Sequence, residues 1–137
     1  PADGSIVVMG DVNSTDGDRM GNSLGGYDIW IVKLNNSDGE ITWDRSLGDA
    51  NKNNGFSFRQ TSDGGYVVAG WTETGSSPNI WVYKLSGAGA PEWGEELDRA
   101  GIEDQPVIQQ IISCEYVLVG RAGATTARDY WVVKLAP

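Results

Sequence analysis

Histidine is absent from this sequence of 137 residues, and cysteine occurs once. Without histidine, neither a Ser-His-Asp nor a Cys-His nucleophilic mechanism can be assembled. One cysteine cannot form an internal disulfide, and there is no Cys/His set to hold zinc. Cys114 has no basic neighbour in the sequence, which predicts an inert thiol.

Basic residues are also few. Ten Lys and Arg against nineteen Asp and Glu give a formal charge of −9. A chain this acidic repels phosphate backbones and anionic lipid surfaces, so we expect no nucleic-acid partner. The longest apolar runs, such as 6–9 and 66–69, are too short to cross a bilayer. We therefore expect no membrane insertion.

A repeat of about fifty residues is the main feature that is present. The segment WIVKL at 30–34 returns as WVYKL at 81–85 and WVVKL at 131–135, at offsets of 51 and 50 residues. Upstream of each, IVVMG at 6–10 matches YVVAG at 66–70 and YVLVG at 116–120. Because several independent segments repeat with nearly the same spacing, chance is a poor explanation.

Each repeated segment is typical of a β-strand. The segments are short, rich in β-branched and aromatic residues, and bounded by Gly, Asp, Asn and Ser. No window shows a sustained helical period, so we expect no long helix. One unit contains four strands, A to D, near 56–61, 65–70, 79–85 and 91–97, and the chain runs B-C-D, A-B-C-D, A-B-C. Strands apolar on both faces belong to sheets covered on both sides.

These features predict an all-β protein made of β-propeller blades, since a blade is a four-stranded antiparallel sheet packed between its neighbours. We expect one repeat region over 1–137, with a partial blade at 1–48, a full blade at 49–98 and a partial blade at 99–137. Roughly 2.6 blades cannot close a ring, which needs at least about four. We therefore expect a homo-oligomer, or a longer chain, to complete it. The alternative is a β-trefoil, which also has three four-stranded repeats.

The repeats also carry a family resemblance. The run QTSDGGYVVAG at 60–70 and the run DIWIVKL at 28–34 resemble the repeats of bacterial and archaeal secreted β-propeller proteins. The resemblance covers nearly the whole chain and departs most at Cys114 and Glu115, where the second repeat has Gly64 and Gly65. It implies the propeller fold and an extracellular, cell-surface or periplasmic location. Most members of this family have no assigned activity.

The recurring tryptophans and lysines are expected to pack blade against blade. A ligand site needs only one copy of a residue, so recurrence in every unit favours packing. A lysine stem would cover apolar surface while its ammonium reaches a carboxylate of the adjacent blade. The residues predicted to have this role are Trp30, Trp81, Trp131, Trp43, Trp93, Lys33, Lys84 and Lys134.

Trp71 differs from the other tryptophans because its counterparts are Asp11 and Arg121. At the start of a B–C loop it could stack on a sugar or a protein partner, or it could merely cover an edge. The candidate ligand-binding residues are therefore four: Trp71, Asp11, Arg121 and Asn13.

The first B–C loop, 11–27, is nine residues longer than the other two. Asp11, Asn13, Asp16 and Asp18 could supply oxygen ligands for calcium. Their spacing does not match a known calcium loop, and a solvated, turn-rich loop is the simpler interpretation. The segment 49–55 comes nearer to that spacing but lacks a terminal Glu. No other cofactor is expected.

Three functions follow in order of preference. The first is a non-catalytic binding or scaffold module, with variable B–C and D–A loops on the two rims as docking sites for protein or cell-surface partners. The second is a lectin-like, carbohydrate-binding propeller. The third is a fragment of a glycoside-acting enzyme, although no pair of carboxylates is singled out.

Overall fold

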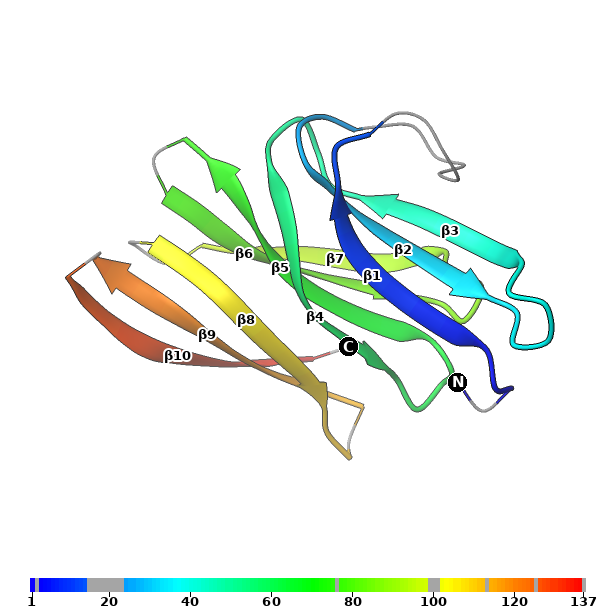
Figure 1. Ribbon diagram of the computed structural model, residues 1–137. Coiled ribbons are helices and arrows are strands. Elements are labelled where there is room, and N and C mark those ends of the chain that lie inside the picture. Colours follow the sequence, from blue (N-terminus) through cyan, green and yellow to red (C-terminus); the bar gives the residue numbers. More distant parts are fainter. Residues whose placement is uncertain are drawn as a thin grey trace.

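The computed structural model of the protein describes residues 1, 3–14, 24–75, 77–98, 102–112, 114–124 and 126–136, which form three antiparallel β-sheets (Figure 1). The first sheet contains β1 (Ile6–Val12), β2 (Asp28–Leu34) and β3 (Ile41–Leu47). The second contains β4 (Asn53–Gln60), β5 (Tyr66–Thr74), β6 (Ser77–Leu85) and β7 (Pro91–Leu97). The third contains β8 (Ile102–Gln110), β9 (Tyr116–Ala124) and β10 (Ala127–Leu135).

The all-β prediction is confirmed. Over the described ranges the structure contains strands and turns but no helix, and hence no helix long enough to cross a membrane. Within each sheet, strands that follow one another in sequence are also hydrogen-bonded neighbours. The predicted strands exist, but β5 continues through Trp71 to Thr74, so this tryptophan lies in a strand rather than at the start of a loop.

Two apolar layers hold the three sheets together. In the first layer, the Ile29 and Ile31 side chains of the first sheet pack on Tyr66, Val68 and Trp81 of the second. Because side chains alternate along a strand, the residues between these on the second sheet, such as Val67 between Tyr66 and Val68, point to the other face of that sheet. The second sheet is consequently buried on both faces.

The second layer lies between the other face of the second sheet and the third sheet. Val67, Ala69 and Val82 pack there on Tyr116 and Leu118. All of these side chains are almost completely buried. Figure 1 shows the resulting order, with the second sheet between the first and the third.

The outer faces of the stack are apolar but uncovered. On the first sheet, Ile6 and Val8 are half-exposed. On the third sheet, Val107, Tyr130 and Val132 are 53%, 80% and 64% exposed. These positions continue the apolar alternation of their strands, so each end of the stack presents a face of the kind that is buried inside it.

The connections between strands divide between the two ends of the sheets. Since consecutive strands are antiparallel, the β1–β2 and β5–β6 connections lie at the same end as the β3–β4 connection. The prediction that B–C and D–A loops occupy opposite rims is therefore wrong. The strand ends from which these connections leave, those of β1, β3 and β5, share one end of the sheets, toward the top of Figure 1.

Candidate functional site

The three recurring lysines each pair with a carboxylate of their own sheet. Lys33 Nζ lies 2.9 Å from Asp3 Oδ2, and Lys134 Nζ lies 2.7 Å from Glu115 Oε1. Asp3, Asp63 and Glu115 all belong to the turn that precedes the second strand of a repeat. The prediction that the ammonium groups reach the adjacent repeat is therefore wrong. Glu115, which departs from the repeat pattern, supplies the carboxylate that an aspartate supplies in the other two turns.

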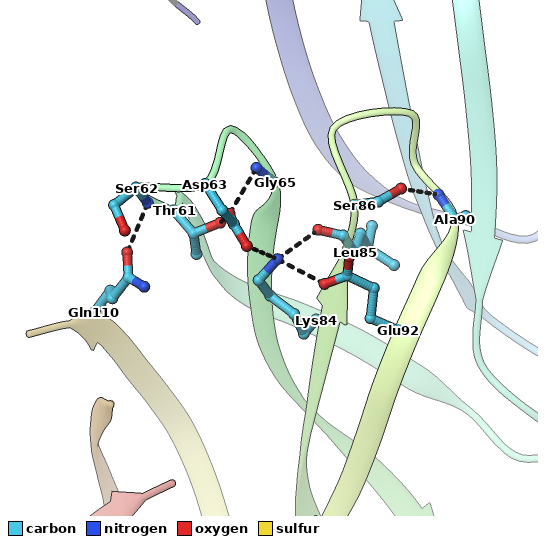
Figure 2. A network of polar contacts seen from close by, with 10 residues as sticks. All are labelled: Thr61, Ser62, Asp63, Gly65, Lys84, Leu85, Ser86, Ala90, Glu92 and Gln110. Atoms are coloured by element: carbon cyan, nitrogen blue, oxygen red, sulfur yellow. Dashed lines mark hydrogen bonds and ion pairs between the residues drawn. The ribbon is translucent and has the colours of Figure 1, made fainter. Parts of the chain in front are cut away.

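Lys84 forms the most buried of these networks (Figure 2). Its Nζ lies 2.9 Å from both Asp63 Oδ2 and Glu92 Oε2 and donates to the Leu85 carbonyl at 3.1 Å. Desolvation lowers the pKa of Lys84, but hydrogen bonds to Glu92 and Asp63 outweigh it and leave the pKa above its ordinary value. The network fixes the turn geometry and leaves no ammonium proton for chemistry.

Four of the five recurring tryptophans occupy the sheet interfaces, to different extents, whereas Trp30 does not pack between sheets of the described residues as predicted. Trp43 and Trp81 are buried in the first apolar layer. Trp93 and Trp131 pack against the second layer and are partly buried. Trp30 lies on the outer face of the first sheet, where its indole Nε1 donates to Asp44 Oδ2 at 2.9 Å.

The candidate ligand residues from the sequence do not converge. Asp11, Trp71 and Arg121 lie at equivalent positions of three different sheets. Asp11 Oδ1 accepts from the Gly55 backbone N–H at 2.8 Å and so ties β1 to β4. Lys52 Nζ lies 5.4 Å from the Trp71 ring centroid, so a cation already covers this indole.

Calcium finds little support in the residues that are described. Asp16 and Asp18 lie outside the described residues, and Asn13 is an exposed residue just after β1. No group of three or more acidic or cysteine side chains in the described ranges is arranged to hold a metal ion. In the segment 49–55, the Asp49 carboxylate instead accepts from the Asn51 backbone and both the Asn51 and Asn53 side-chain amides.

A pocket of about 380 Å³ lies where the β3–β4 connection crosses the second sheet. Its volume falls within the range of about 300 to 1,000 Å³ that is usual for small-molecule sites. The β3–β4 connection and the four strands of the second sheet line it: Asp49, Asn53, Thr72, Trp81, Tyr83, Gly94, Glu95 and Glu96. Three of these residues, Trp81, Tyr83 and Gly94, were not predicted to bind a ligand.

Two of the residues that line the pocket carry buried polar side-chain atoms. Trp81 and Thr72 are each only 4% exposed. Neither Trp81 Nε1 nor Thr72 Oγ1 has a hydrogen-bond partner among the described residues. Both atoms are buried from the pocket as well as from solvent, and an unmade hydrogen bond of this kind costs about 1–3 kcal/mol.

Comparison with the first sheet explains the unpaired indole. Val32 and Asp44 face each other across β2 and β3, and Tyr83 and Gly94 occupy the same paired positions on β6 and β7. Asp44 is the acceptor for Trp30, so replacement of the aspartate by Gly94 removes the acceptor for Trp81. The Tyr83 ring lies over Gly94 so closely that a Cβ built on the glycine would be 2.5 Å from Tyr83 Cε1.

The rim of the pocket is acidic. Asp49, Glu95 and Glu96 line it, and among the described residues no basic side chain does. Burial raises the pKa of Asp49, but hydrogen bonds from Asn53 and Asn51 outweigh burial and hold the pKa below its ordinary value. Burial, with the nearby charges of Asp49 and Glu96, raises the pKa of the Tyr83 phenol. The site therefore presents an ionised Asp49 carboxylate near the neutral Tyr83 phenol.

Sequence reasoning missed this site for an identifiable reason. It treated recurrence as the sign of packing and searched the longest loop for ligands. The signal was the pair of changes within the repeat, Val32 to Tyr83 and Asp44 to Gly94, on strands assigned to packing.

Comparisons with known proteins add no family assignment: no protein-family model matches the chain, and a search of curated proteins found no match.

Proposed function

We propose that the three sheets are consecutive blades of a β-propeller and that the protein is a non-catalytic binding module. One observation supports the propeller most directly: equivalent faces meet twice along the stack. The Ile29 face of the first sheet packs on the Trp81 face of the second, and the Ile80 face of the second packs on the Trp131 face of the third. Repetition of one interface is how a propeller grows around its axis.

The ring in this proposal is completed by further blades from other copies of the chain. The first sheet presents a Trp30 face equivalent to the Trp81 face, with a hollow of about 370 Å³ beside Trp30 and Val32. The third sheet presents Tyr130 and Val132, which are equivalent to the buried Ile80 and Val82. Head-to-tail contact of these two faces would reproduce the internal interface and, by rotation, close a ring.

Light scattering on the purified chain tests the ring. We expect a defined assembly whose mass is a multiple of 14.7 kDa. A folded monomer that stays monomeric at high concentration would contradict the proposal, because two apolar sheet faces would then be stable in water.

The pocket supports binding rather than catalysis. A general acid for glycoside cleavage needs a raised carboxyl pKa, whereas the pKa of Asp49 is lowered. Neither the Trp81 indole N–H nor the Thr72 hydroxyl transfers a proton at neutral pH. Turnover of an aryl-glycoside panel, lost on Asp49→Asn or Glu95→Gln, would overturn the non-catalytic part.

The same proposal includes where the protein is located relative to the cell. The resemblance of the repeats to secreted propeller proteins supports an extracellular, cell-surface or periplasmic module. In that setting the connections gathered at one end of the sheets are the natural docking surface for partners.

A further inference from the structure

We propose that the hollow beside Trp30, on the outer face of the first sheet, is a socket for an aromatic side chain from an extended strand of a partner polypeptide. This side chain would take the place that Trp43 has against the second sheet. The inference rests on the proposed binding function and names the chemistry of the partner for that face.

The position of Trp43 at the first internal interface shows how such a socket is filled. The ring lies over the β6–β7 hairpin, where a Cβ built on Gly89 would be 2.8 Å from Trp43 Cε3. Its centroid is 5.8 Å from that of the Tyr66 ring, in an edge-on arrangement. At the next interface the Trp93 centroid is 5.6 Å from that of Tyr116 in the same arrangement. At both interfaces, a tryptophan from the last strand of one sheet therefore packs on the following sheet.

The β2–β3 hairpin of the first sheet has the same backbone shape with open space beside it. Gly39 has φ +75°, and its counterpart Gly89 has φ +76°. A Cβ built on Gly39 would meet nothing within 4 Å, so no described side chain lies on Gly39 as Trp43 lies on Gly89. The hollow of about 370 Å³ is found here, and its lining residues are Trp30, Val32, Leu34, Gly39, Glu40 and Ile41.

The contacts of Trp43 indicate what the socket recognises. Its buried indole Nε1 has no hydrogen-bond partner among the described residues, so the ring packs as apolar surface. Two residues along β3, on the same face, Arg45 Nε donates to the Gly89 carbonyl oxygen at 3.0 Å. Glu40 lines the hollow where the second sheet has Ala90, and its carboxylate would attract a guanidinium. The partner strand should therefore carry an aromatic residue followed two positions later by a basic one.

The strand that carries this aromatic residue also has a place to pair. In the second sheet β7 lies beside β6, whereas in the described part of the third sheet β10 has a strand neighbour only on its β9 side. An extended segment added to this edge of β10 would continue the sheet through backbone hydrogen bonds. In the head-to-tail arrangement of copies, its aromatic side chain would face the socket of the next copy.

Binding of a peptide with the sequence of β3 tests the socket. The probe is EITWDRSLG, residues 40–48, with a fluorescent label, and fluorescence anisotropy measures its binding to the purified chain. We expect saturable binding, and the peptide with Trp43→Ala should bind at least about tenfold more weakly because it lacks the ring. Equal binding of these two peptides, or no binding of either, would overturn the proposal. The peptide with Arg45→Ala should bind about fivefold more weakly, and an unchanged affinity would overturn the basic position.

A variant of the protein locates the binding. Gly39→Asn places a side chain where Gly89 leaves room for Trp43, and asparagine tolerates positive φ, so peptide binding should be lost while the thermal transition is retained. Gly64→Asn is the matched control, because Gly64 has φ +81° and a Cβ on it would also meet nothing within 4 Å. The control should bind the peptide as the original chain does. Retained binding in Gly39→Asn would place the peptide elsewhere and overturn the proposal.

Light scattering on the same samples separates the socket from the ring of copies. A defined assembly that does not bind the peptide would overturn the socket and leave the ring standing. A single chain whose peptide binding is lost in Gly39→Asn would overturn the ring and leave the socket standing.

Discussion

Lys84 has a buried ammonium group, and its two carboxylate partners determine how much this group contributes to the free energy of unfolding. The side chain is 3% exposed, whereas its partners Asp63 and Glu92 are 57% and 45% exposed. If the lysine were removed, the two carboxylates would turn to water, so the loss would be smaller than for a fully buried pair.

We expect Lys84→Met to lower the free energy of unfolding by about 2 kcal/mol, measured by urea denaturation. Lys134→Met is the matched control, because Lys134 has the same repeat position but is 59% exposed. The control should lose less than about 1 kcal/mol. Equal losses in the two variants would show that burial of the Lys84 network is not what stabilises the turn.

The Asp63 carboxyl makes the free energy of unfolding depend on pH. Hydrogen bonds from Thr61, Lys84 and the Gly65 backbone lower the pKa of Asp63 from 3.8 to about 2. A carboxyl whose pKa is lowered by folding stabilises the protein above its unfolded pKa, and this contribution is lost as pH falls through the folded value.

The free energy of unfolding should therefore fall between about pH 5 and pH 2, and Asp63→Asn should remove part of that fall. NMR titration of the Asp63 carboxyl is the direct measurement. A midpoint near 3.8 instead of about 2 would show that these hydrogen bonds do not hold in solution.

Among the elements, β5 is a central strand of the second sheet, with β4 on one side and β6 on the other. Gly70 faces Gly55 across a β-bulge, and a Cβ built on it would be 2.1 Å from the Asn54 carbonyl oxygen and 2.2 Å from the Trp81 ring. Gly10 is its counterpart on β1, and a Cβ there would meet nothing within 4 Å.

We expect Gly70→Ala to lose about 2–4 kcal/mol of unfolding free energy, because the backbone of β4 cannot retreat without breaking its pairing. Gly10→Ala should change it by no more than about 0.5 kcal/mol. Thermal and chemical denaturation measure both, and a tolerated Gly70→Ala would mean that β4 is not packed against β5 as described.

At the scale of the whole molecule, the exposed outer faces of the first and third sheets determine whether copies of the chain assemble. Val132 on β10 is 64% exposed, whereas its equivalent Val82 is fully buried between sheets. If copies of the chain cover this face, a charge placed there would be buried without a partner.

Val132→Asp should therefore reduce the mass seen by light scattering to that of a single chain, with the β-type circular dichroism retained. Ala88→Asp adds the same charge in the exposed β6–β7 hairpin and should leave the mass unchanged. An unchanged assembly in Val132→Asp would show that this face is not an interface between copies.

Much of the fold was predictable because the repeats carry it locally. Short β-branched strands, turn glycines such as Gly64 with φ +81°, and the recurring lysine position all follow from neighbouring residues. The partners of the lysines were not predictable, since Glu115 reaches Lys134 from a position where the other repeats have no acid. The pocket was not predictable either, because it joins the β3–β4 connection to strands more than twenty residues away.

The sequence by itself determined the number of repeats, the strands within them and the absence of histidine chemistry, because composition and periodicity are local properties of the chain. Only the tertiary structure decided which faces meet, that each lysine pairs within its own sheet, and that the connections of β1–β2, β3–β4 and β5–β6 share one end. It also decided that, where Gly94 stands in place of Asp44, the buried Trp81 N–H has no acceptor in the part of the chain that the structure describes. The physical reason is that hydrogen-bond satisfaction depends on groups brought together by packing, which a pattern along the chain does not record.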